Sequence, residues 1–198
     1  MTAFVSSPAP DFTADAYVNG EFKQISLSQF KGKKVVLFFY PLDFTFVCPT
    51  EILAFVDSID EFKKRNTEVI GVSVDSKFTH MAWANTARED GGIKGVNYPL
   101  VSDLNKQIAR DYGVLIEGPG IALRGLFIIN KDGMLKHSTI NHLDLGRSID
   151  EVLRLLDAVD YTEQNGEVCP ANWKKGDKGM NASPEGVAAY LTEHAAAL

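Results

Sequence analysis

The chain is poor in cysteine: Cys48 and Cys169 are the only two, and they stand far apart in the sequence. No Cys-x-x-Cys pair accompanies either of them, and no two histidines stand at helical spacing. Zinc sites need four clustered ligands of those kinds, so we expect no metal site. The four histidines are scattered, and we expect each to be a surface or capping residue; they are His80, His137, His142 and His194.

An excess of positive charge is also missing. Lys and Arg number 20 against 26 Asp and Glu, a net charge of −6, which argues against a nucleic-acid partner because phosphate binding needs clustered basic residues. The most apolar run, "VVLFFY" (35–40), is far shorter than the roughly 20 residues of a membrane helix. Neither a G-x-G-x-x-G nor a Walker A motif is present, so no nucleotide cofactor is expected.

The N-terminal stretch "MTAFVSSPAPDF" shows no basic flank followed by an apolar core, so we expect no secretory signal and a cytoplasmic location. Stable structural disulfides are rare in that compartment. The two cysteines are therefore expected to be free thiols, metal ligands or redox groups.

Strands are predicted at five places along the chain. A hairpin is centred on Asn19-Gly20, because Asn-Gly suits a tight turn with positive φ angles. Continuous β-branched and aromatic runs at 33–40 and 67–75 are typical of strands buried on both faces, and a shorter candidate lies at 97–103. A second hairpin is expected at 122–140, with "KDG" at its bend.

Helical patterns alternate with these strands. Five apolar residues spaced for one helix face follow Pro49, namely Ile52, Phe55, Val56, Ile59 and Phe62. Further helices are predicted at 76–90, ending at Gly91-Gly92, from Asp103 to Tyr112, at 149–161 behind a Ser148/Glu151 capping box, and from Ser183-Pro184 onward. This order indicates a mixed α/β sheet with helices on both faces, residues 1–161, followed by an extended arm, residues 162–198.

Cys48 lies where a predicted buried strand gives way to a helix, with Pro49 suited to the first helical position. Backbone N–H groups and the helix dipole favour an anion there, so this position favours the nucleophilic thiolate. Thr45 precedes Cys48 by three residues, which would bring its hydroxyl near the sulfur in a turn or helix. The alternatives are an inert buried cysteine, and a threonine that faces solvent or caps its own turn.

Two segments resemble a known family. "YPLDFTFVCPTE" is similar to the P-x-x-x-T-x-x-C motif of peroxiredoxins in Pro41, Thr45 and Cys48, and "VCPANW" around Cys169 resembles the resolving-cysteine segment of the typical two-cysteine subfamily. Further matches cover nearly the whole chain; they are "APDF" (9–12), "VIGVSVDS" (69–76), "YPLVSD" (98–103), "LRGLFIIN" (123–130) and "GRSIDEVLR" (146–154).

The resemblance implies a thioredoxin-like fold and a cofactor-free peroxidase. Cys48 would attack the peroxide and become a sulfenic acid, and Cys169, from the partner subunit, would condense with it to a disulfide. Thioredoxin, or a flavoprotein with a thioredoxin-like module, would reduce that disulfide. The subfamily forms dimers that join into decamers.

By the same resemblance, Thr45, Pro41 and Arg124 join the two cysteines in the active site. Pro41 would shield the sulfur, and Glu51 with Arg147 would hold the arginine and the thiolate in place. Arg124 lies inside the apolar run "IALRGLFII", where an unpaired charge would be costly. Its alternative role is that of an arginine on a strand surface.

The chain departs from members that are easily over-oxidised. Those carry Gly-Gly-Leu-Gly and a C-terminal Tyr-Phe pair, whereas this chain has "GGIK" (91–94) and Tyr190-Leu191, so our hypothesis is intermediate sensitivity to over-oxidation.

Other functions stay open at this point. A thiol–disulfide oxidoreductase would normally carry Cys-x-x-Cys, a holdase for unfolded chains would expose a large apolar helix, and a Cys–His hydrolase would need a partnered histidine.

Overall fold

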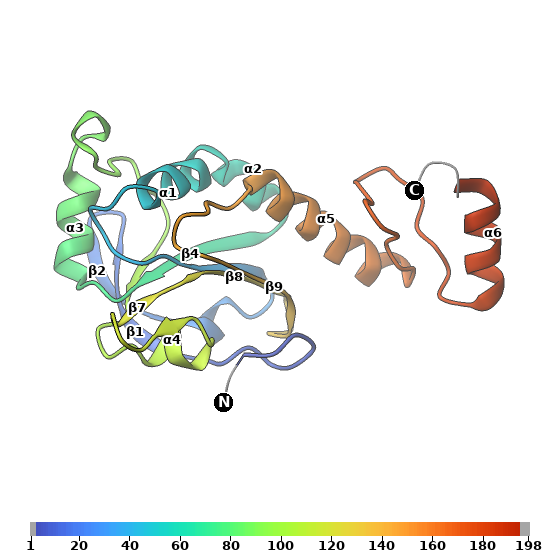
Figure 1. Cartoon of the computed structure of the whole chain (residues 1–198), viewed down its shortest axis with the longest axis horizontal. Helices are drawn as coiled ribbons and strands as arrows, with labels where there is room; N and C mark the ends of the chain where they lie inside the picture. Colours follow the sequence, from blue (N-terminus) through green and yellow to red (C-terminus); the bar gives the residue numbers. More distant parts are fainter. Residues whose placement is uncertain (1–2, 195–198) are drawn as a thin grey trace. The chain divides into compact units, whose positions relative to one another are not determined.

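The computed structural model describes residues 3–194. They belong to two compact units, Met1–Ile149 and Asp150–Leu198 (Figure 1). No helix within residues 3–194 combines the length and the apolar character that crossing a membrane would require.

The first unit is built on a seven-stranded sheet with the order β2-β1-β5-β4-β3-β8-β9. Strands β3, β4 and β5 pair in parallel, and the remaining neighbours pair antiparallel, which confirms the predicted mixed sheet. The strands are β1 Thr13–Val18, β2 Glu21–Ser26, β3 Lys34–Phe39, β4 Thr67–Ser73, β5 Leu100–Ser102, β8 Arg124–Ile129 and β9 Leu135–Asn141, with a separate small pair of β6 Leu115–Ile116 and β7 Ile121–Ala122.

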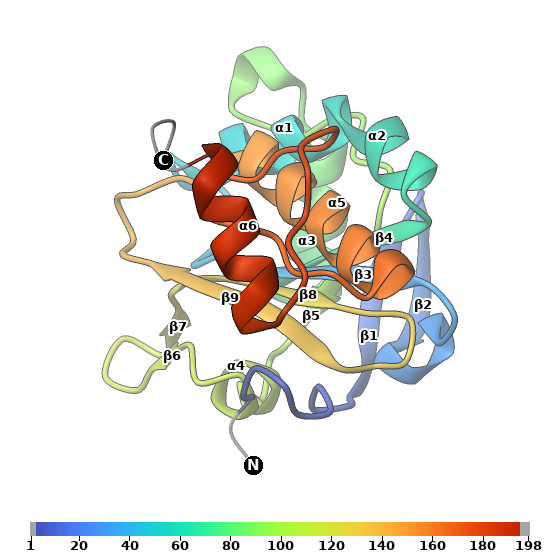
Figure 2. The same ribbon diagram turned by 90° about the vertical axis from the view of Figure 1, so that its right-hand side faces the viewer.

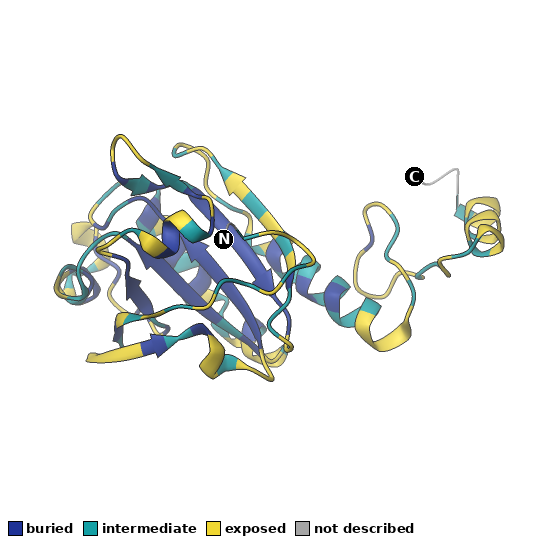
Figure 3. Cartoon of the chain, turned by 90° about the horizontal axis from the view of Figure 1, so that it is seen from below, coloured by how far each residue is buried: buried dark blue, intermediate teal, exposed yellow. Residues whose placement is uncertain are grey.

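The two predicted hairpins and the central strands follow from local chemistry. Asn19 and Gly20 both have positive φ angles, 49° and 90°, as the tight turn between β1 and β2 requires. Every residue of β3 and β8 is buried, and Figure 3 shows this centre of the sheet in dark blue. In contrast, β9 alternates between buried or half-buried and exposed residues and is the last strand in the order.

Helices cover both faces of this sheet, as predicted. Helices α1 (Cys48–Asp57) and α2 (Ile59–Lys64) lie on one face, and α4 (Gln107–Asp111) lies on the other (Figures 1 and 2). Helix α3 (Lys77–Asn85) packs against β1 and β5. Two 3-10 turns complete the unit, Leu27–Phe30 and Arg88–Asp90.

Strand β3 sends alternate aromatic side chains into the two layers. Phe39 contacts Tyr112, the residue after α4, with ring centroids 5.3 Å apart. Phe38 stacks on Phe55 of α1 at 4.5 Å on the opposite face. Since successive residues of a strand point to opposite faces, Tyr40 continues the Phe38 side, and this places the residues after β3 beside α1.

Three predicted helices in this unit differ in length from expectation. The helix expected from Asp103 to Tyr112 is confined to Gln107–Asp111, because Lys106 before it has a left-handed φ angle of 62°. The Asp103 carboxylate still accepts from N–H groups of that helix, at Ile108 and Ala109. The helix expected over 49–62 is interrupted at Ser58, so α1 and α2 are separate. The helix expected over 76–90 ends at Asn85, because Thr86 is extended and the following loop folds back. Its N–H groups at Ile93 and Lys94 donate to the carbonyls of Trp83 and Thr86, and the Ile93 side chain is completely buried.

The second unit consists of α5 (Ile149–Asn165), a loop and α6 (Pro184–His194). Helix α5 runs four residues past the predicted end, and Asn165 donates from its side chain to the carbonyl of Tyr161 there. The loop is closed by an antiparallel bridge between Val168 and Met180. Ser183 caps α6 as predicted, since its hydroxyl accepts from the N–H of Gly186 at 3.0 Å.

Candidate active site

Cys48 is the first residue of α1, a short loop after the end of β3. Its side chain is fully buried, and Pro49 takes the second helical position rather than the first. The predicted strand-to-helix position is therefore correct to within one residue. Pro41, which opens the loop, is buried as well.

Thr45 lies beside the sulfur, as its spacing predicts. Its Oγ1 is 3.0 Å from Sγ of Cys48 and 2.8 Å from the carbonyl oxygen of Leu42. The hydroxyl has one hydrogen, so it can donate to only one of these acceptors at a time. Phe44 turns the chain just before it, with a φ angle of 54° that is uncommon for a bulky residue.

Arg124 approaches the same sulfur from β8. Its Nη1 lies 3.3 Å from Sγ of Cys48 and 2.7 Å from Oε2 of Glu51, and its Nε donates to the carbonyl of Leu143 at 2.7 Å. The residue is 3% exposed, so these contacts replace the water that a guanidinium would otherwise bind.

Glu51 links the two predicted arginines. Arg147 donates to its carboxylate from Nε at 2.7 Å, from Nη2 at 2.9 Å and from the backbone N–H at 2.9 Å. The remaining nitrogen of Arg147 donates to the carbonyls of Phe39 and Gly125, at the end of β3 and the start of β8. Such a two-pronged pairing fixes both side chains in one geometry.

The charges of this cluster do not cancel. Two guanidinium groups and one carboxylate, all nearly inaccessible to solvent, carry one net positive charge beside Sγ of Cys48. A buried charge is stable only when paired, so an anion at Sγ would complete the balance. The structure thus brings together Thr45, Cys48, Glu51, Arg124 and Arg147.

Cys169 lies in the second unit, in the loop after α5. Its Sγ is partly buried and 3.8 Å from the carbonyl of Ala158. Burial raises the pKa of the Cys169 thiol, and the positive charge of Arg154 acts in the opposite direction. Arg154 in turn donates to the carbonyl of Trp173, at 2.7 Å. Both cysteines are free thiols.

His80 corrects one prediction from the sequence. It is completely buried rather than on the surface, and its Nδ1 lies 2.7 Å from Oδ2 of Asp43, which Tyr40 also contacts. The one hint of a polar site in the sequence is Asp43, which lies inside the motif between Pro41 and Thr45. Its partner His80 could not be found from the sequence, because it lies on a helix 37 residues further along the chain.

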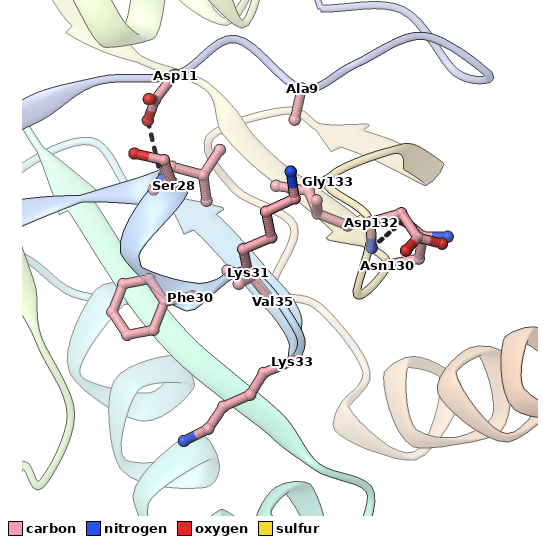
Figure 4. A pocket seen from close by; sticks show the side chains of 12 residues that line it. Ala9, Asp11, Ser28, Phe30, Lys31, Lys33, Val35, Asn130, Asp132 and Gly133 are labelled. Carbon is pink, nitrogen blue, oxygen red and sulfur yellow. Dashed lines mark hydrogen bonds between the residues drawn. The ribbon is translucent and has the colours of Figure 1, made fainter.

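Other site types find no support in the described part of the chain. Among residues 3–194, no three His, Cys, Asp or Glu side chains are grouped so that they could hold a metal ion. A cavity of about 170 Å³ lies near the start of β3, at the other end of that strand from Cys48 (Figure 4). Lys31, Lys33 and Asp11 lie among its lining residues, and none of the predicted site residues does.

Comparison with known proteins places these features in a family context. Residues 5–138 match the model of the AhpC/TSA family, and residues 158–193 match that of the C-terminal domain of 1-Cys peroxiredoxin. The chain is 57% identical to 2-Cys peroxiredoxin BAS1, chloroplastic, of Hordeum vulgare, over 94% of this chain and 90% of that protein. It is 53% identical to thioredoxin peroxidase of Echinococcus granulosus, over 97% of this chain and all of that protein.

The similarity extends to solved structures. The reduced 2-Cys peroxiredoxin of Plasmodium vivax superposes with a TM-score of 0.93 at 47% identity, covering 96% of this chain and 99% of that one.

Proposed function

The chain belongs to the AhpC/TSA family and is a peroxiredoxin, a thiol-dependent peroxidase, and from this premise we propose that Cys48 reduces hydrogen peroxide and organic hydroperoxides. The observation that carries the assignment of Cys48 is the pair of donors on its sulfur, Thr45 at 3.0 Å and Arg124 at 3.3 Å.

The first step is a displacement at oxygen. The thiolate of Cys48 attacks one peroxide oxygen, the O–O bond breaks, and the departing oxygen takes up a proton as water or an alcohol, which leaves a sulfenic acid. Negative charge moves from sulfur to oxygen during this step. Arg124 and Thr45 hold their donors beside the sulfur, next to the peroxide oxygens that receive this charge, and burial makes such donors more effective than they would be in water.

The second step is condensation with Cys169. Its thiolate attacks the sulfenic sulfur, the S–O bond breaks as the disulfide forms, and the departing hydroxyl group takes up a proton and leaves as water. A disulfide needs Cα atoms about 4.4–6.8 Å apart. Because Cys48 is fully buried in the first turn of α1, that turn has to unwind before the sulfurs can meet. We propose that Cys169 comes from the partner subunit, as the resemblance to two-cysteine peroxiredoxins implies.

Assembly into a dimer is supported by the edge of the sheet. Strand β9 ends the strand order, and its half-exposed Ile140 lies on that strand. A last strand can pair with the same strand of a second copy. We further propose that dimers join into a decamer, for which exposed aromatic residues around the active-site loop offer apolar surface; Phe46 is 93% and Phe44 52% exposed.

We propose that the reductant is thioredoxin or a flavoprotein disulfide reductase. We also propose that the reaction needs no cofactor and involves neither nucleic acid nor a membrane. The name of the Echinococcus relative, thioredoxin peroxidase, supports thioredoxin as the reductant. We propose a cytoplasmic location, where a thiol-reducing system is at hand. We also propose residues 1–161 as the peroxiredoxin domain and 162–198 as the segment that carries the resolving cysteine.

Rapid mixing of the reduced protein with one equivalent of hydrogen peroxide tests the assignment. The wild type should lose thiol quickly and form a Cys48–Cys169 bridge, visible as a covalent dimer on a non-reducing gel. Cys48→Ser should abolish both events, whereas Cys169→Ser should keep the first oxidation and block turnover with thioredoxin. Peroxide consumption by Cys48→Ser at the wild-type rate would refute the proposal.

A further inference from the structure

Behind the active-site loop lies a buried group of three polar side chains that the steps above do not use. Tyr40, Asp43 and His80 are 0%, 7% and 0% exposed. The Tyr40 hydroxyl donates to Oδ1 of Asp43 at 2.8 Å, and Nδ1 of His80 lies 2.7 Å from Oδ2. Both oxygens of the carboxylate are thus occupied, one by the residue directly after β3 and the other by a residue of α3.

The two ring nitrogens of His80 both face oxygen atoms of neighbouring elements. Nδ1 faces the carboxylate of Asp43, and Nε2 lies 3.3 Å from the carbonyl oxygen of Val101 on β5. A hydrogen on either nitrogen therefore has an acceptor within reach. Tyr40, directly after β3, faces the ring as well, with Oη 3.5 Å from Nδ1. Burial raises the pKa of Asp43, and the hydrogen bond and charge of His80 oppose that shift.

The same helix holds the next residue of the loop. The ring of Phe44 packs on Trp83 with centroids 5.7 Å apart, and Trp83 follows His80 by three residues, on the same face of α3. Phe44 has the positive φ angle of 54°, a conformation that a bulky residue keeps only when its surroundings hold it. Helix α3 therefore contacts two successive residues of the loop, Asp43 through His80 and Phe44 through Trp83.

The loop is tied to the sheet at the same point. The backbone N–H of Asp43 donates to Oδ2 of Asp75, just after β4, at 2.9 Å. Thr45, whose hydroxyl contacts Cys48, is two residues beyond Asp43. The position of that hydroxyl therefore depends on contacts made by Asp43 and Phe44.

We propose that His80 is a positioning residue for peroxide reduction: its buried hydrogen bond with Asp43 holds the loop of residues 41–45 so that Thr45 meets Cys48, and it delays the unwinding of α1 that disulfide formation requires. This inference rests on the proposed function of Cys48. It predicts opposite effects on the two steps. Loss of the pair should slow the reaction with peroxide and speed the subsequent condensation with Cys169.

Single-turnover rapid mixing with hydrogen peroxide separates the two steps, because loss of the Cys48 thiol precedes the appearance of the disulfide. For His80→Leu we expect the peroxide step to slow about tenfold, as for loss of one hydrogen bond to a buried charged group, while disulfide formation accelerates. His80→Asn keeps an N–H near the position of Nδ1 and should recover most of the peroxide rate. It also keeps a polar group in the site, so it remains informative if His80→Leu fails to fold.

His142→Asn is the matched control. His142 makes an analogous contact with Asp144, at 3.2 Å, but both side chains are largely exposed, so neither step should change. Unchanged rates in both His80 variants, or equal slowing of both steps, would overturn the proposal. Failure of the proposed function would instead show in the wild type, as absence of Cys48 oxidation.

Discussion

A single nitrogen of Arg124, Nη1, lies within hydrogen-bonding distance of the sulfur of Cys48, at 3.3 Å. The same nitrogen donates to Glu51 at 2.7 Å, so the carboxylate fixes the guanidinium in the position from which it meets the sulfur. A guanidinium nitrogen of this kind carries two hydrogens and can serve both acceptors together. The contact to Cys48 is therefore set by a buried ion pair within the chain itself.

Replacement of this arginine should act mainly on the peroxide step. For Arg124→Gln we expect the rate of Cys48 oxidation to fall about 10²–10³-fold, the loss typical of removing one preorganised donor from a developing charge. Rapid mixing with stoichiometric hydrogen peroxide measures it. Arg110→Gln, which removes an exposed arginine paired with Glu117, serves as the control and should react normally. A near-normal rate for Arg124→Gln would contradict the role given to it.

Glu51 should matter for stability as well as for activity. Glu51→Gln leaves two buried guanidinium groups without their carboxylate, so we expect the free energy of unfolding to fall by about 3–5 kcal/mol. Urea denaturation followed by circular dichroism provides the measurement. In the control Glu61→Gln, an exposed carboxylate that pairs with Lys64 and Arg65 is lost, and the midpoint should hardly move. Equal midpoints for the two variants would show that the buried cluster is not stabilising.

The hydroxyl of Thr45 should be replaceable only by another hydroxyl. Thr45→Ser keeps a donor 3.0 Å from the sulfur and is expected to oxidise at close to the wild-type rate. Thr45→Val keeps the shape but loses the donor, and its rate should fall by roughly 10–100-fold. The same stopped-flow assay distinguishes the two. If valine and serine were equivalent, packing rather than hydrogen bonding would explain the position.

Arg154 should tune the second step through the ionisation of Cys169. Condensation needs the Cys169 thiolate, so its rate should rise as pH increases through the pKa of that thiol, which burial raises. The positive charge of Arg154 lowers this pKa, and Arg154→Gln should therefore move the rise to higher pH.

The measurement for Arg154 is the rate of disulfide formation after a single peroxide equivalent, over a series of pH values. Arg154→Lys keeps the charge and should stay close to the wild type, and Lys175→Gln, which loses an exposed lysine in the same unit, should leave the profile unchanged. A profile for Arg154→Gln that coincides with that of the wild type would refute this role.

Sensitivity to excess peroxide should be intermediate. The segment 91–94 and the pair Tyr190-Leu191 match only part of the motifs of easily inactivated members. Activity loss during turnover at rising peroxide concentration tests this, because each failure to form the disulfide in time exposes the sulfenic acid to a second oxidation. A loss as steep as that of a fully sensitive peroxiredoxin would disprove the expectation.

Local patterns in the sequence predicted much of the fold. The Asn19-Gly20 hairpin, the buried strand β3 and the cysteine at the start of α1 all depend on neighbours close in the chain, so their spacing carries the information. The Thr45–Cys48 contact also belongs to this group, because three residues separate the partners. Helix ends were less predictable, since α3 stops before Thr86, where the loop that follows folds back and its N–H groups donate to the carbonyls of Trp83 and Thr86.

Contacts between side chains that are far apart in the sequence could be identified only from the tertiary structure. Family resemblance indicated Arg124, Glu51 and Arg147. That both arginines donate to the carboxylate of Glu51 is known only from the tertiary structure, in which β8, α1 and the loop before α5 meet. His80 was misjudged as a surface residue, because nothing near it in sequence shows that Asp43 would lie against its ring. A polar side chain can be buried only where a partner satisfies it, and that partner is brought there by the packing of the whole unit.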